Sequence, residues 1–560
     1  MDGEDRTGTA IAGTGSRPAR RAQDWWKGAV IYEVYLRSFR DSDGDGVGDL
    51  RGVIAKLDYI ASLGVDALWL SPFYKSPMAD FGYDAADYRL IDPSAGTMED
   101  FLELRDACHR RGLRLLLDFV PAHTSEEHPW FVDSRARGPK ADWYVWADKA
   151  PDGGPPNNWL SSFGGSAWSW EPRRGQYYYH PFLKEQPALN LANPDVLEQM
   201  AEQLDYWIGA GADGFRLDAV QCLGHDPDLR DNPPRGRADP PLLIGGGPGN
   251  PFGDQLHVFD RNAPGTRTVL RRLRRLAEER GAVLIGELAD VVTEHVAEDF
   301  VGSAEGLHAV YDFDLINCRP DVDVLHRTLR GRAACTGGWM LNAFTNHDSR
   351  RAVSNLTGFA RPENRGAAAR MLLFLQLTLR GGAVIYQGDE LGLPHPELAY
   401  EDILDPWAKA FWPVFEGRDG ARTPFPWDGG PQAGFSEADR TWLPPAREHR
   451  GLDVATQEAD PASVLSFFRA FNGWRGRQEI LRRGDIRIDA RDRAPVIAWT
   501  RSLNGREWCA AVNFSEDQAF LEWPGAPRQL DAPGLRAGVT PHGVEFPAFG
   551  YTLFEARTSP

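Results

Sequence analysis

Acidic side chains follow several short apolar segments of this chain, and their types fit the cleavage of a glycosidic bond. Asp218 lies in GFRLDAV, Glu287 in VLIGEL, and Asp348 ends LNAFTNHD. Cleavage through an oxocarbenium-like state needs one carboxylate as nucleophile and one carboxylic acid to protonate the leaving oxygen. In enzymes that retain the anomeric configuration the two groups are about 5–5.5 Å apart. The sequence therefore predicts a pair of facing carboxyl groups.

An arginine accompanies the first of these acids. Arg216 precedes Asp218 by two residues, so both side chains point to the same face if the segment is a strand. We expect the guanidinium to orient the Asp218 carboxylate, to keep it ionised and to lower its pKa. Glu287 must stay protonated to act as an acid, and burial beside like charges favours that state.

A single acid at the end of a strand is more often structural than catalytic. Several ionisable groups buried together are costly unless they have a function, and that cost favours a catalytic interpretation. Seven such residues stand at the ends of four predicted strands, namely Asp118, His123, Arg216, Asp218, Glu287, His347 and Asp348.

Eight short apolar segments that end in polar residues alternate with helical patterns. The helical patterns include FLELRDACHRRG from Phe101 and TVLRRLRRLAEERG from Thr268, both closed by Gly. Strand and helix repeated eight times predict an α/β fold, a (β/α)8 TIM barrel whose chemistry lies at the carboxyl ends of the strands. The predicted strands begin at Val30, Ala67, Leu113, Gly214, Val283, Ala309, Leu341 and Ala383.

Two stretches depart from a plain barrel. Pro121–Pro194 is rich in Gly, Pro, Trp and Tyr and is too long for an ordinary loop, which predicts a small inserted lobe after the third strand. A helical segment from about Ser463 leads into alternating short strands, which predict a C-terminal antiparallel β domain. The predicted divisions are a disordered leader at 1–23, the barrel at 24–120 and 191–475, the lobe at 121–190 and the β domain at 476–560.

Composition excludes several classes of function. The formal net charge is −18 and no dense basic stripe is present, so nucleic acid is not an expected partner. No run of 18 uncharged apolar residues occurs, so no membrane association is expected. The five scattered cysteines indicate neither a disulfide framework nor a zinc cluster, and they favour a reducing, cytoplasmic location. No organic cofactor is expected, and the oligomeric state stays open.

A separate acidic motif, DSDGDGVGD, runs from Asp41 to Asp49. Alternating acids and glycines allow a tight loop to wrap oxygen ligands around a hard cation, as in the first half of an EF-hand. Position twelve of such a loop would be Gly52, where an EF-hand needs Glu. We therefore expect one structural divalent cation, Ca²⁺ or Mg²⁺, outside an EF-hand.

The strings DFVPAH, GFRLDAV, IGEL and FTNHD resemble the four short conserved regions of glycoside hydrolase family 13, the α-amylase family, in their expected order, and QPALN resembles its fifth. The resemblance runs from about Trp25 to the C-terminus. It implies that Asp218 is the nucleophile, Glu287 the acid/base and Asp348 the third carboxylate, which grips sugar hydroxyls. It also implies that the innermost sugar is surrounded by Arg216, His123 and His347.

Longer strings, WWKGAVIYEVYLRSF, DFGYDAADY and GRDGARTPFPW, resemble the α-glucosidase and oligo-1,6-glucosidase branch of that family. This implies a pocket closed beyond one sugar, and a preference for α-1,4 bonds because the small Ala219 follows the nucleophile. It further implies binding of the terminal glucose by Asp80 and Tyr83, a pocket shaped by Phe163 and Phe182, a rim formed by Gln186 and Arg418, and a cation held by Asp41, Asp43, Asp45, the Val47 carbonyl and Asp49.

The expected function is thus that of a retaining, exo-acting α-glucosidase. It would release terminal α-glucose from maltose-like oligosaccharides or small α-glucosides and transfer glucose to other hydroxyls. One alternative is glucosyl transfer of the trehalose synthase or sucrose isomerase kind, which uses the same carboxylates. An alternative of another class is a non-catalytic barrel like the heavy chain of an amino-acid transporter.

Overall fold

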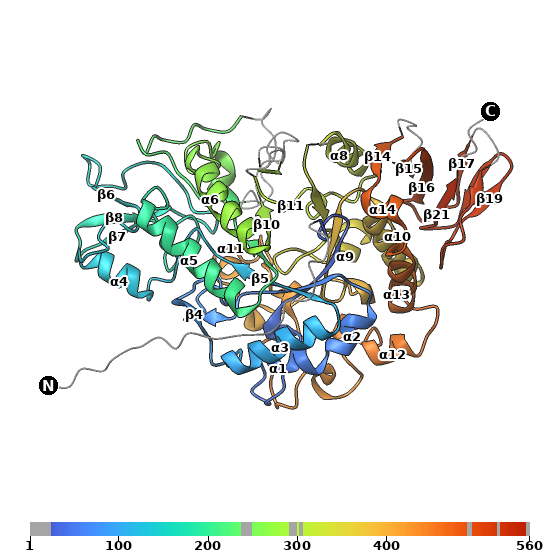
Figure 1. The fold of residues 1–560 in the computed structure, drawn as a ribbon, viewed down its shortest axis with the longest axis horizontal. Coiled ribbons are helices and arrows are strands. Elements are labelled where there is room, and N and C mark those ends of the chain that lie inside the picture. Colours follow the sequence, from blue (N-terminus) through green and yellow to red (C-terminus); the bar gives the residue numbers. More distant parts are fainter. Residues whose placement is uncertain are drawn as a thin grey trace.

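Eight parallel strands close into a barrel at the centre of the molecule (Figure 1). The computed structural model describes residues 24–236, 249–289, 300–301, 306–335, 337–489, 495–523 and 527–555; the predicted leader, 1–23, lies outside the described residues. All eight predicted strands are confirmed. In their order around the barrel they are β1 (Val30–Val34), β13 (Gly382–Tyr386), β12 (Met340–Asn342), β11 (Ala309–Asp312), β10 (Val283–Leu288), β9 (Gly214–Leu217), β5 (Arg114–Phe119) and β2 (Ala67–Leu70).

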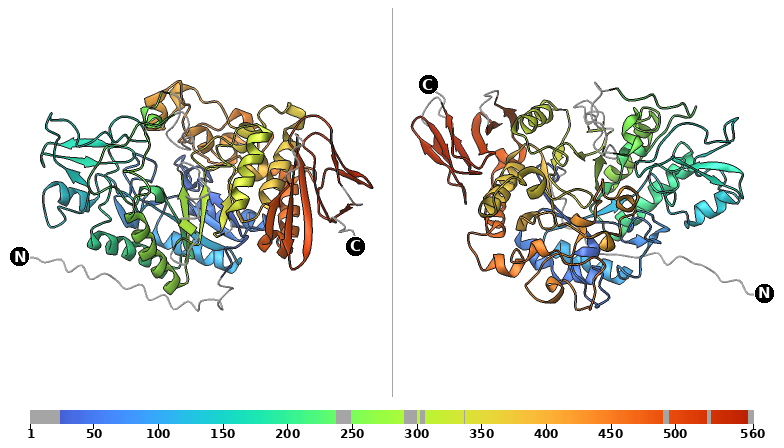
Figure 2. Two further views of the ribbon diagram at one scale, coloured as in Figure 1. Left: turned by 90° about the horizontal axis from the view of Figure 1, so that it is seen from above. Right: turned by 180° about the vertical axis from the view of Figure 1, so that it is seen from behind.

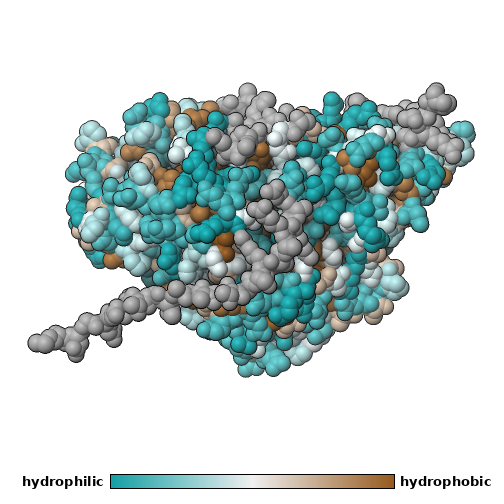
Figure 3. Space-filling model, in the orientation of Figure 1, coloured by the Kyte–Doolittle hydropathy of each residue, from teal (hydrophilic) through white to brown (hydrophobic). Residues whose placement is uncertain are grey.

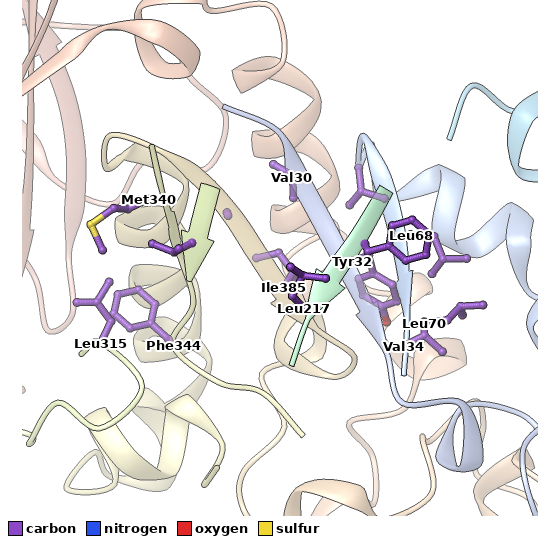
Figure 4. Packing of buried hydrophobic residues seen from close by; sticks show 14 of the residues in the cluster. Val30, Tyr32, Val34, Leu68, Leu70, Leu217, Leu315, Met340, Phe344 and Ile385 are labelled. Carbon is purple, nitrogen blue, oxygen red and sulfur yellow. The ribbon is translucent and has the colours of Figure 1, made fainter. Parts of the chain in front are cut away.

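Both faces of these strands are buried, which is why the segments read as continuous apolar runs. Alternate residues point outward to the helices, and Figure 4 shows Val30 and Tyr32 from β1 near Leu68 from β2 in that outer layer. The residues between them, such as Ile31 and Trp69, belong to a second cluster that fills the barrel. Period two therefore decides which strand residues face the interior.

Helices cover the outside of the barrel and begin and end where capping residues stand. Thr97 and Asp100 form a capping box at the start of α3 (Met98–Arg110). Gly211 and Gly281, both left-handed, end α5 (Pro194–Ala210) and α6 (Gly265–Arg280). The other barrel helices are α1 (Leu50–Ala55), α2 (Leu57–Ser62), α8 (Val322–Ala334), α9 (Ala352–Thr357), α10 (Arg365–Thr378), α11 (Pro406–Phe411) and α12 (Val454–Glu458).

The predicted inserted lobe stands at one end of the molecule (Figure 1). It contains α4 (Pro129–Arg135) and a small antiparallel sheet in the order β6-β8-β7, formed by Trp146–Ala147, Gln176–Tyr179 and Trp168–Glu171. Its core is aromatic, with Trp159 stacked on Trp168. The abundance of rings in this stretch thus reflects packing of the lobe as well as any contact with sugar.

The C-terminal β domain stands at the opposite end (Figures 1 and 2). Helices α13 (Val464–Arg475) and α14 (Glu479–Arg483) lead into two antiparallel sheets, β14-β15-β16-β21-β18 and β17-β20-β19. Their strands are β14 (Asp485–Ile488), β15 (Val496–Leu503), β16 (Arg506–Asn513), β17 (Ala519–Glu522), β18 (Arg528–Gln529), β19 (Gly538–Thr540), β20 (Gly543–Phe546) and β21 (Tyr551–Glu555).

Two buried arginines join this domain to the barrel. Arg501 on β15 donates hydrogen bonds to the carbonyl oxygens of Thr378 and Leu379 at the end of α10, at 2.8 and 2.9 Å. Arg475 on α13 donates to the carbonyl oxygen of Leu377 at 2.6 Å. The last carbonyls of a helix lack partners within the helix, so these arginines complete its C-terminus.

Hydrophilic residues cover most of the face seen in Figure 3, and hydrophobic residues form small scattered groups there. Among the described residues, none of the helices combines the length and the apolar character that a bilayer crossing requires.

Candidate active site

Arg216 is the centre of the charged cluster at the carboxyl ends of the strands. It is 1% exposed and points into the barrel from β9. Its Nη1 lies 2.7 Å from Asp118 Oδ1 and 2.8 Å from Asp218 Oδ1, and its Nη2 donates to Glu287. One guanidinium therefore contacts three carboxyl groups at the ends of the neighbouring strands β5, β9 and β10. Their side chains share the interior of the barrel because alternate residues of each strand point to the same face.

Asp218 and Glu287 face each other beside this arginine. Both carboxyl groups contact the same guanidinium, which brings them close together. Ala219, in the left-handed region with φ 44°, turns its N–H to Glu287 Oε2 at 3.2 Å. Close carboxyl groups of this kind suit a mechanism with a covalent intermediate, whereas an inverting mechanism needs room for a water between them.

Burial gives these two acids different pKa values. It raises the pKa of Asp218 to about 6 and that of Glu287 to about 8, and the Arg216 charge opposes both shifts. The sequence predicted a lowered pKa for Asp218. That prediction is wrong in its net direction, because burial outweighs the nearby positive charge. The order of the two values still leaves Asp218 ionised and Glu287 protonated between them.

Asp348 is held by two other arginines. Arg422 Nη2 donates to Asp348 Oδ1, and Arg418 Nη1 lies 3.7 Å from the same oxygen. These two arginine charges outweigh burial and hold the pKa of Asp348 well below its usual range. Sequence reasoning missed Arg422, which stands inside GRDGARTPFPW and could have been noticed there as a second arginine.

A wall of paired charges lies beside Asp348. Arg418 Nη2 is 2.7 Å from Asp80 Oδ1 and 2.8 Å from Asp405 Oδ1, and Gln186 Nε2 donates to Asp80 Oδ2 at 3.1 Å. All four side chains are almost fully buried. The structure brings together the predicted Asp80, Gln186 and Arg418 and adds Asp405, which sequence reasoning missed.

Two histidines and a tyrosine connect this wall to the central cluster. The Tyr83 hydroxyl lies 3.0 Å from Asp118 Oδ2 and 2.7 Å from His347 Nε2. His123 Nε2 is 2.9 Å from the Tyr83 carbonyl oxygen, and within the described residues its buried Nδ1 has no partner. Burial lowers the pKa of His123 to about 4, so this ring is neutral.

Aromatic rings complete the predicted binding residues. Phe182 packs edge-on against His123 at 5.4 Å between ring centres and contacts Phe163 at 5.6 Å. Phe163 stacks on Trp407 of α11 at 4.8 Å and lies under the Arg418 guanidinium. The predicted phenylalanines thus adjoin the predicted polar residues, which come partly from the lobe, as Gln186 does, and partly from the barrel, as Arg418 does.

Glu33, at the end of β1, is a further member of this cluster that sequence reasoning missed. It is 0% exposed, and its Oε1 lies 2.5 Å from His347 Nδ1. Its sequence signal was present, since Glu33 follows the inward-facing Ile31 by two residues inside VIYEVYL. A charged residue at an inward position of a buried strand is costly unless it has a partner.

The acidic loop lies apart from these residues. Carboxylate oxygens of Asp41, Asp43 and Asp49 come within 4.8 Å of one another. Asp45 is outside this group, and its Oδ1 accepts a hydrogen bond from the Val47 N–H at 2.7 Å. Three close carboxylates supply the hard oxygen ligands that Ca²⁺ and Mg²⁺ prefer, so the residues fit such an ion.

This chain is similar in sequence to known glycosidases. The family model for the alpha-amylase catalytic domain matches residues 33–484. A probable alpha-glucosidase of Rhizobium meliloti is 43% identical, covering 94% of this chain and 96% of the relative. An oligo-1,6-glucosidase of Parageobacillus thermoglucosidasius is 33% identical, covering 89% of this chain and 92% of the relative.

Two solved structures are similar to this chain over nearly its whole length. The crystal structure of an alpha-glucosyl transfer enzyme, XgtA, has a TM-score of 0.91 and 44% identity, covering 95% of this chain and 100% of that one. The trehalulose synthase MutB from Pseudomonas mesoacidophila MX-45 has a TM-score of 0.85 and 33% identity, covering 95% of this chain and 99% of that one.

Proposed function

Because the chain belongs to the alpha-amylase family and is a glycoside hydrolase, we propose that it is a retaining, exo-acting α-glucosidase. The observation that carries this proposal is the pair formed by Asp218 and Glu287 on the Arg216 guanidinium. The pair combines two carboxyl groups on one guanidinium, as the small separation in a retaining enzyme requires, with one acid that ionises well before the other.

In the first step the Asp218 carboxylate attacks the anomeric carbon while Glu287 gives its proton to the glycosidic oxygen. The bond to the leaving sugar breaks, and a glucosyl ester forms on Asp218. In the second step Glu287, now ionised, takes a proton from water or from another sugar hydroxyl, which attacks the same carbon and frees Asp218. Two inversions give overall retention.

The paired charges next to Asp348 support release of single terminal sugars. Arg418 is bonded to Asp80 and Asp405 and lies close to Asp348, and all of these side chains are largely buried. A polysaccharide chain cannot pass through side chains bonded to one another in this way. We therefore assign this wall to the closed end of the site, where Asp80, Tyr83, His123 and His347 bind the terminal glucose.

The space beside the leaving sugar decides which glycosidic linkage is cleaved. Ala219 lies directly beside Glu287, and its left-handed backbone disfavours a β-branched side chain at this position. The small side chain supports a preference for α-1,4 bonds. A methyl-sized difference in a pocket supplies about 1–3 kcal/mol of discrimination, so the ratio of kcat/KM on maltose to that on isomaltose tests it directly.

Glucosyl transfer is the second candidate, and the solved alpha-glucosyl transfer enzyme at 44% identity favours it. Transfer differs from hydrolysis only in the acceptor of the second step. A non-catalytic barrel is disfavoured, because Asp218, Glu287 and Asp348 are all present and arranged around shared arginines.

One experiment tests the proposal. The protein is incubated with maltose, isomaltose, sucrose and trehalose, and the products and the anomer of the first glucose released are followed in time. We expect α-glucose from maltose and transfer products at high sugar concentration. A rearranged disaccharide as the main product would favour isomerisation, and first-formed β-glucose would refute retention.

Two variants test the roles of the acids. Asp218→Asn should remove activity on all substrates while the fold is kept. Glu287→Gln should lose most activity on maltose but much less on an aryl α-glucoside, whose leaving group needs little protonation. Equal losses on both substrates would contradict the role of Glu287 as the acid.

We further propose that Asp41, Asp43 and Asp49 hold one structural divalent cation, with Asp45 and the Val47 carbonyl as further ligands. Such an ion would neutralise the close carboxylates and stiffen the loop before α1. We also propose a cytoplasmic location, which the thiol state of the five cysteines supports.

A further inference from the structure

A chain of hydrogen bonds runs from β1 to the central arginine through residues that lie far apart in the sequence. Glu33 Oε1 is 2.5 Å from His347 Nδ1, and His347 Nε2 is 2.7 Å from the Tyr83 hydroxyl. Tyr83 is 3.0 Å from Asp118 Oδ2, and Asp118 Oδ1 is 2.7 Å from Arg216 Nη1. The His347 ring is also stacked between Tyr83 and Tyr35, at 5.3 and 5.5 Å.

The protons available fix the direction of this chain. Asp118 is paired with the Arg216 cation, and Trp69 Nε1 also donates to its Oδ2, so this carboxylate accepts hydrogen bonds. The single hydroxyl proton of Tyr83 therefore points to Asp118. The Tyr83 oxygen must then accept from His347, which places a proton on Nε2 of that ring.

The remaining question is which atom holds the proton between His347 and Glu33. An ionised Glu33 would need a proton on His347 Nδ1 as well, which makes an imidazolium that faces the Asp348 carboxylate but also Arg216, Arg418 and Arg422, and burial disfavours that charge most. A neutral Glu33 instead donates to the Nδ1 lone pair and creates no new charge. The second arrangement avoids burying an extra pair of charges in a fully enclosed place.

We propose that Glu33 is a positioning residue that acts as a neutral carboxylic acid: it donates its proton to His347 Nδ1 and so fixes the histidine tautomer that orients Tyr83 toward Asp118. The inference rests on the proposed function for its effect on catalysis, but the protonation state of Glu33 is a property of the protein alone.

The surroundings of the two groups support this assignment. The charged groups that face Glu33 are Arg216, Asp118, Asp348 and Asp389, and burial raises the pKa of Glu33 well above its usual range. Burial also lowers the pKa of His347 to about 3. Glu33 Oε2 has no hydrogen-bond partner within the described residues, so no donor stabilises a charge at that oxygen, although the Arg216 charge partly opposes the effect of burial.

The consequence concerns sugar binding. His347 and Tyr83 are both expected to contact the terminal glucose, and the tautomer decides which of their atoms donate. With the direction fixed from Glu33, a sugar hydroxyl always meets the same pattern of donors and acceptors. Without it, the Nδ1 lone pair of His347 loses this donor and the tautomer is held from the Asp118 end alone, so part of the protein presents the wrong pattern.

Two substitutions at Glu33 separate the neutral acid from the ionised one. Glu33→Gln keeps a donor of the same shape toward Nδ1, whereas Glu33→Met removes it. On the preferred α-glucoside, the Met variant should lose about 10- to 100-fold in kcat/KM, as expected for one lost buried hydrogen bond. The Gln variant should recover all but about threefold of wild-type kcat/KM, with an unchanged pH profile. A Gln variant as impaired as the Met variant would overturn the proposal.

Glu390 provides a matched control. It is also fully buried, but it accepts hydrogen bonds from the hydroxyls of Tyr32 and Tyr59 and from the Gly388 N–H. The Gly388 N–H can only donate and both tyrosine hydroxyls donate to the other oxygen, so Glu390→Gln either places two N–H groups against each other or forces the tyrosine hydroxyls to turn. It should lower the unfolding temperature without changing the pH profile. Glu33→Gln keeps its hydrogen bond and should leave the unfolding temperature close to that of wild type, so an equal fall in both variants would contradict the interpretation.

Infrared difference spectra give a readout that does not depend on activity. The wild-type spectrum minus that of Glu33→Gln at pH 7 should contain the carbonyl stretch of a protonated carboxylic acid, shifted in D₂O. A carboxylate band in its place would overturn the proposal even if the enzyme is active. Presence of the acid band in a protein that cleaves no α-glucoside would instead refute the proposed function and leave the state of Glu33 intact.

Discussion

Two regions of this molecule contain buried arginines whose partners differ in kind. At the candidate active site Arg216 binds three carboxyl groups, whereas Arg501, at the junction with the C-terminal β domain, donates its hydrogen bonds within the described residues to backbone carbonyls. Nearby negative charge raises the pKa of Arg216 above its usual range, and burial lowers that of Arg501 to about 9. Both side chains are almost inaccessible to solvent.

The difference teaches how to distinguish a catalytic buried charge from a structural one. A carbonyl cannot change its charge, so an arginine bound to carbonyls only completes backbone hydrogen bonding. Carboxyl groups gain and lose protons, and the arginine that joins them sets how readily they do so. Substitution of an arginine that binds carbonyls should therefore affect stability, and substitution of an arginine that binds carboxyl groups should affect rate.

The largest expected effect is that of Arg216→Lys. Lysine keeps the charge, but its single ammonium cannot hold Asp118, Asp218 and Glu287 in one plane. We expect kcat/KM to fall by about 10³-fold or more, because a preorganised electrostatic contact of the transition state is lost. Steady-state kinetics, with folding checked by near-UV circular dichroism, measures it. Activity within tenfold of wild type would show that charge alone suffices.

Arg501→Met should act on stability instead. It removes the side-chain donor from several buried carbonyls, including those of Leu379 and Gly484. We expect a loss of about 3 kcal/mol in the free energy of unfolding, with kcat unchanged while the protein is folded. Arg506→Met, on an exposed side chain of β16, is the matched control and should change stability by less than about 0.5 kcal/mol. A large fall in kcat would remove the distinction between the two regions.

The dependence of activity on pH tests the carboxyl pair itself. Asp218 must be ionised, so kcat/KM should fall about tenfold per pH unit below about 6. Glu287 must be protonated, so kcat/KM should fall above about 8. A single limb, or a plateau that extends beyond pH 9, would contradict this assignment.

The same shift predicts a change in stability. Because the folded protein keeps the Glu287 proton at a pH where the unfolded chain has lost it, stability decreases as pH rises from about 4.5 to about 8. Glu287→Gln removes this cost, so the variant should unfold at a higher temperature than wild type at pH 8. At pH 5 the two should be nearly equal. Thermal unfolding at both values measures it.

The smallest expected effect is that of removing metal. The carboxylates of Asp41, Asp43 and Asp49 lie together. A bound cation would neutralise their charges, as Arg216 does for the carboxyl groups that it contacts. A chelator should lower the unfolding temperature by a few degrees, about 2–4 °C for each kcal/mol of lost binding, with Ca²⁺ or Mg²⁺ restoring it. Asp43→Asn should abolish this response, whereas Asp531→Asn, on an exposed side chain, should keep it.

The sequence alone determined the barrel and the acids at its carboxyl end. Period two along GFRLDAV places Arg216 and Asp218 on one face, and that relation depends only on neighbouring residues. Continuous apolar runs between capped helices predicted all eight strands, because this pattern also depends only on residues that are close in the sequence. The resemblance then supplied Asp80, Gln186 and Arg418, which no local pattern connects.

Only the tertiary structure decided the contacts between distant segments. Glu33 meets His347 across 314 positions, and Arg422 meets Asp348 across 74. It also decided that burial outweighs Arg216 in setting the pKa of Asp218. A pKa depends on everything that surrounds a group once the chain has closed around it, whereas the order of residues fixes only its neighbours along the strand.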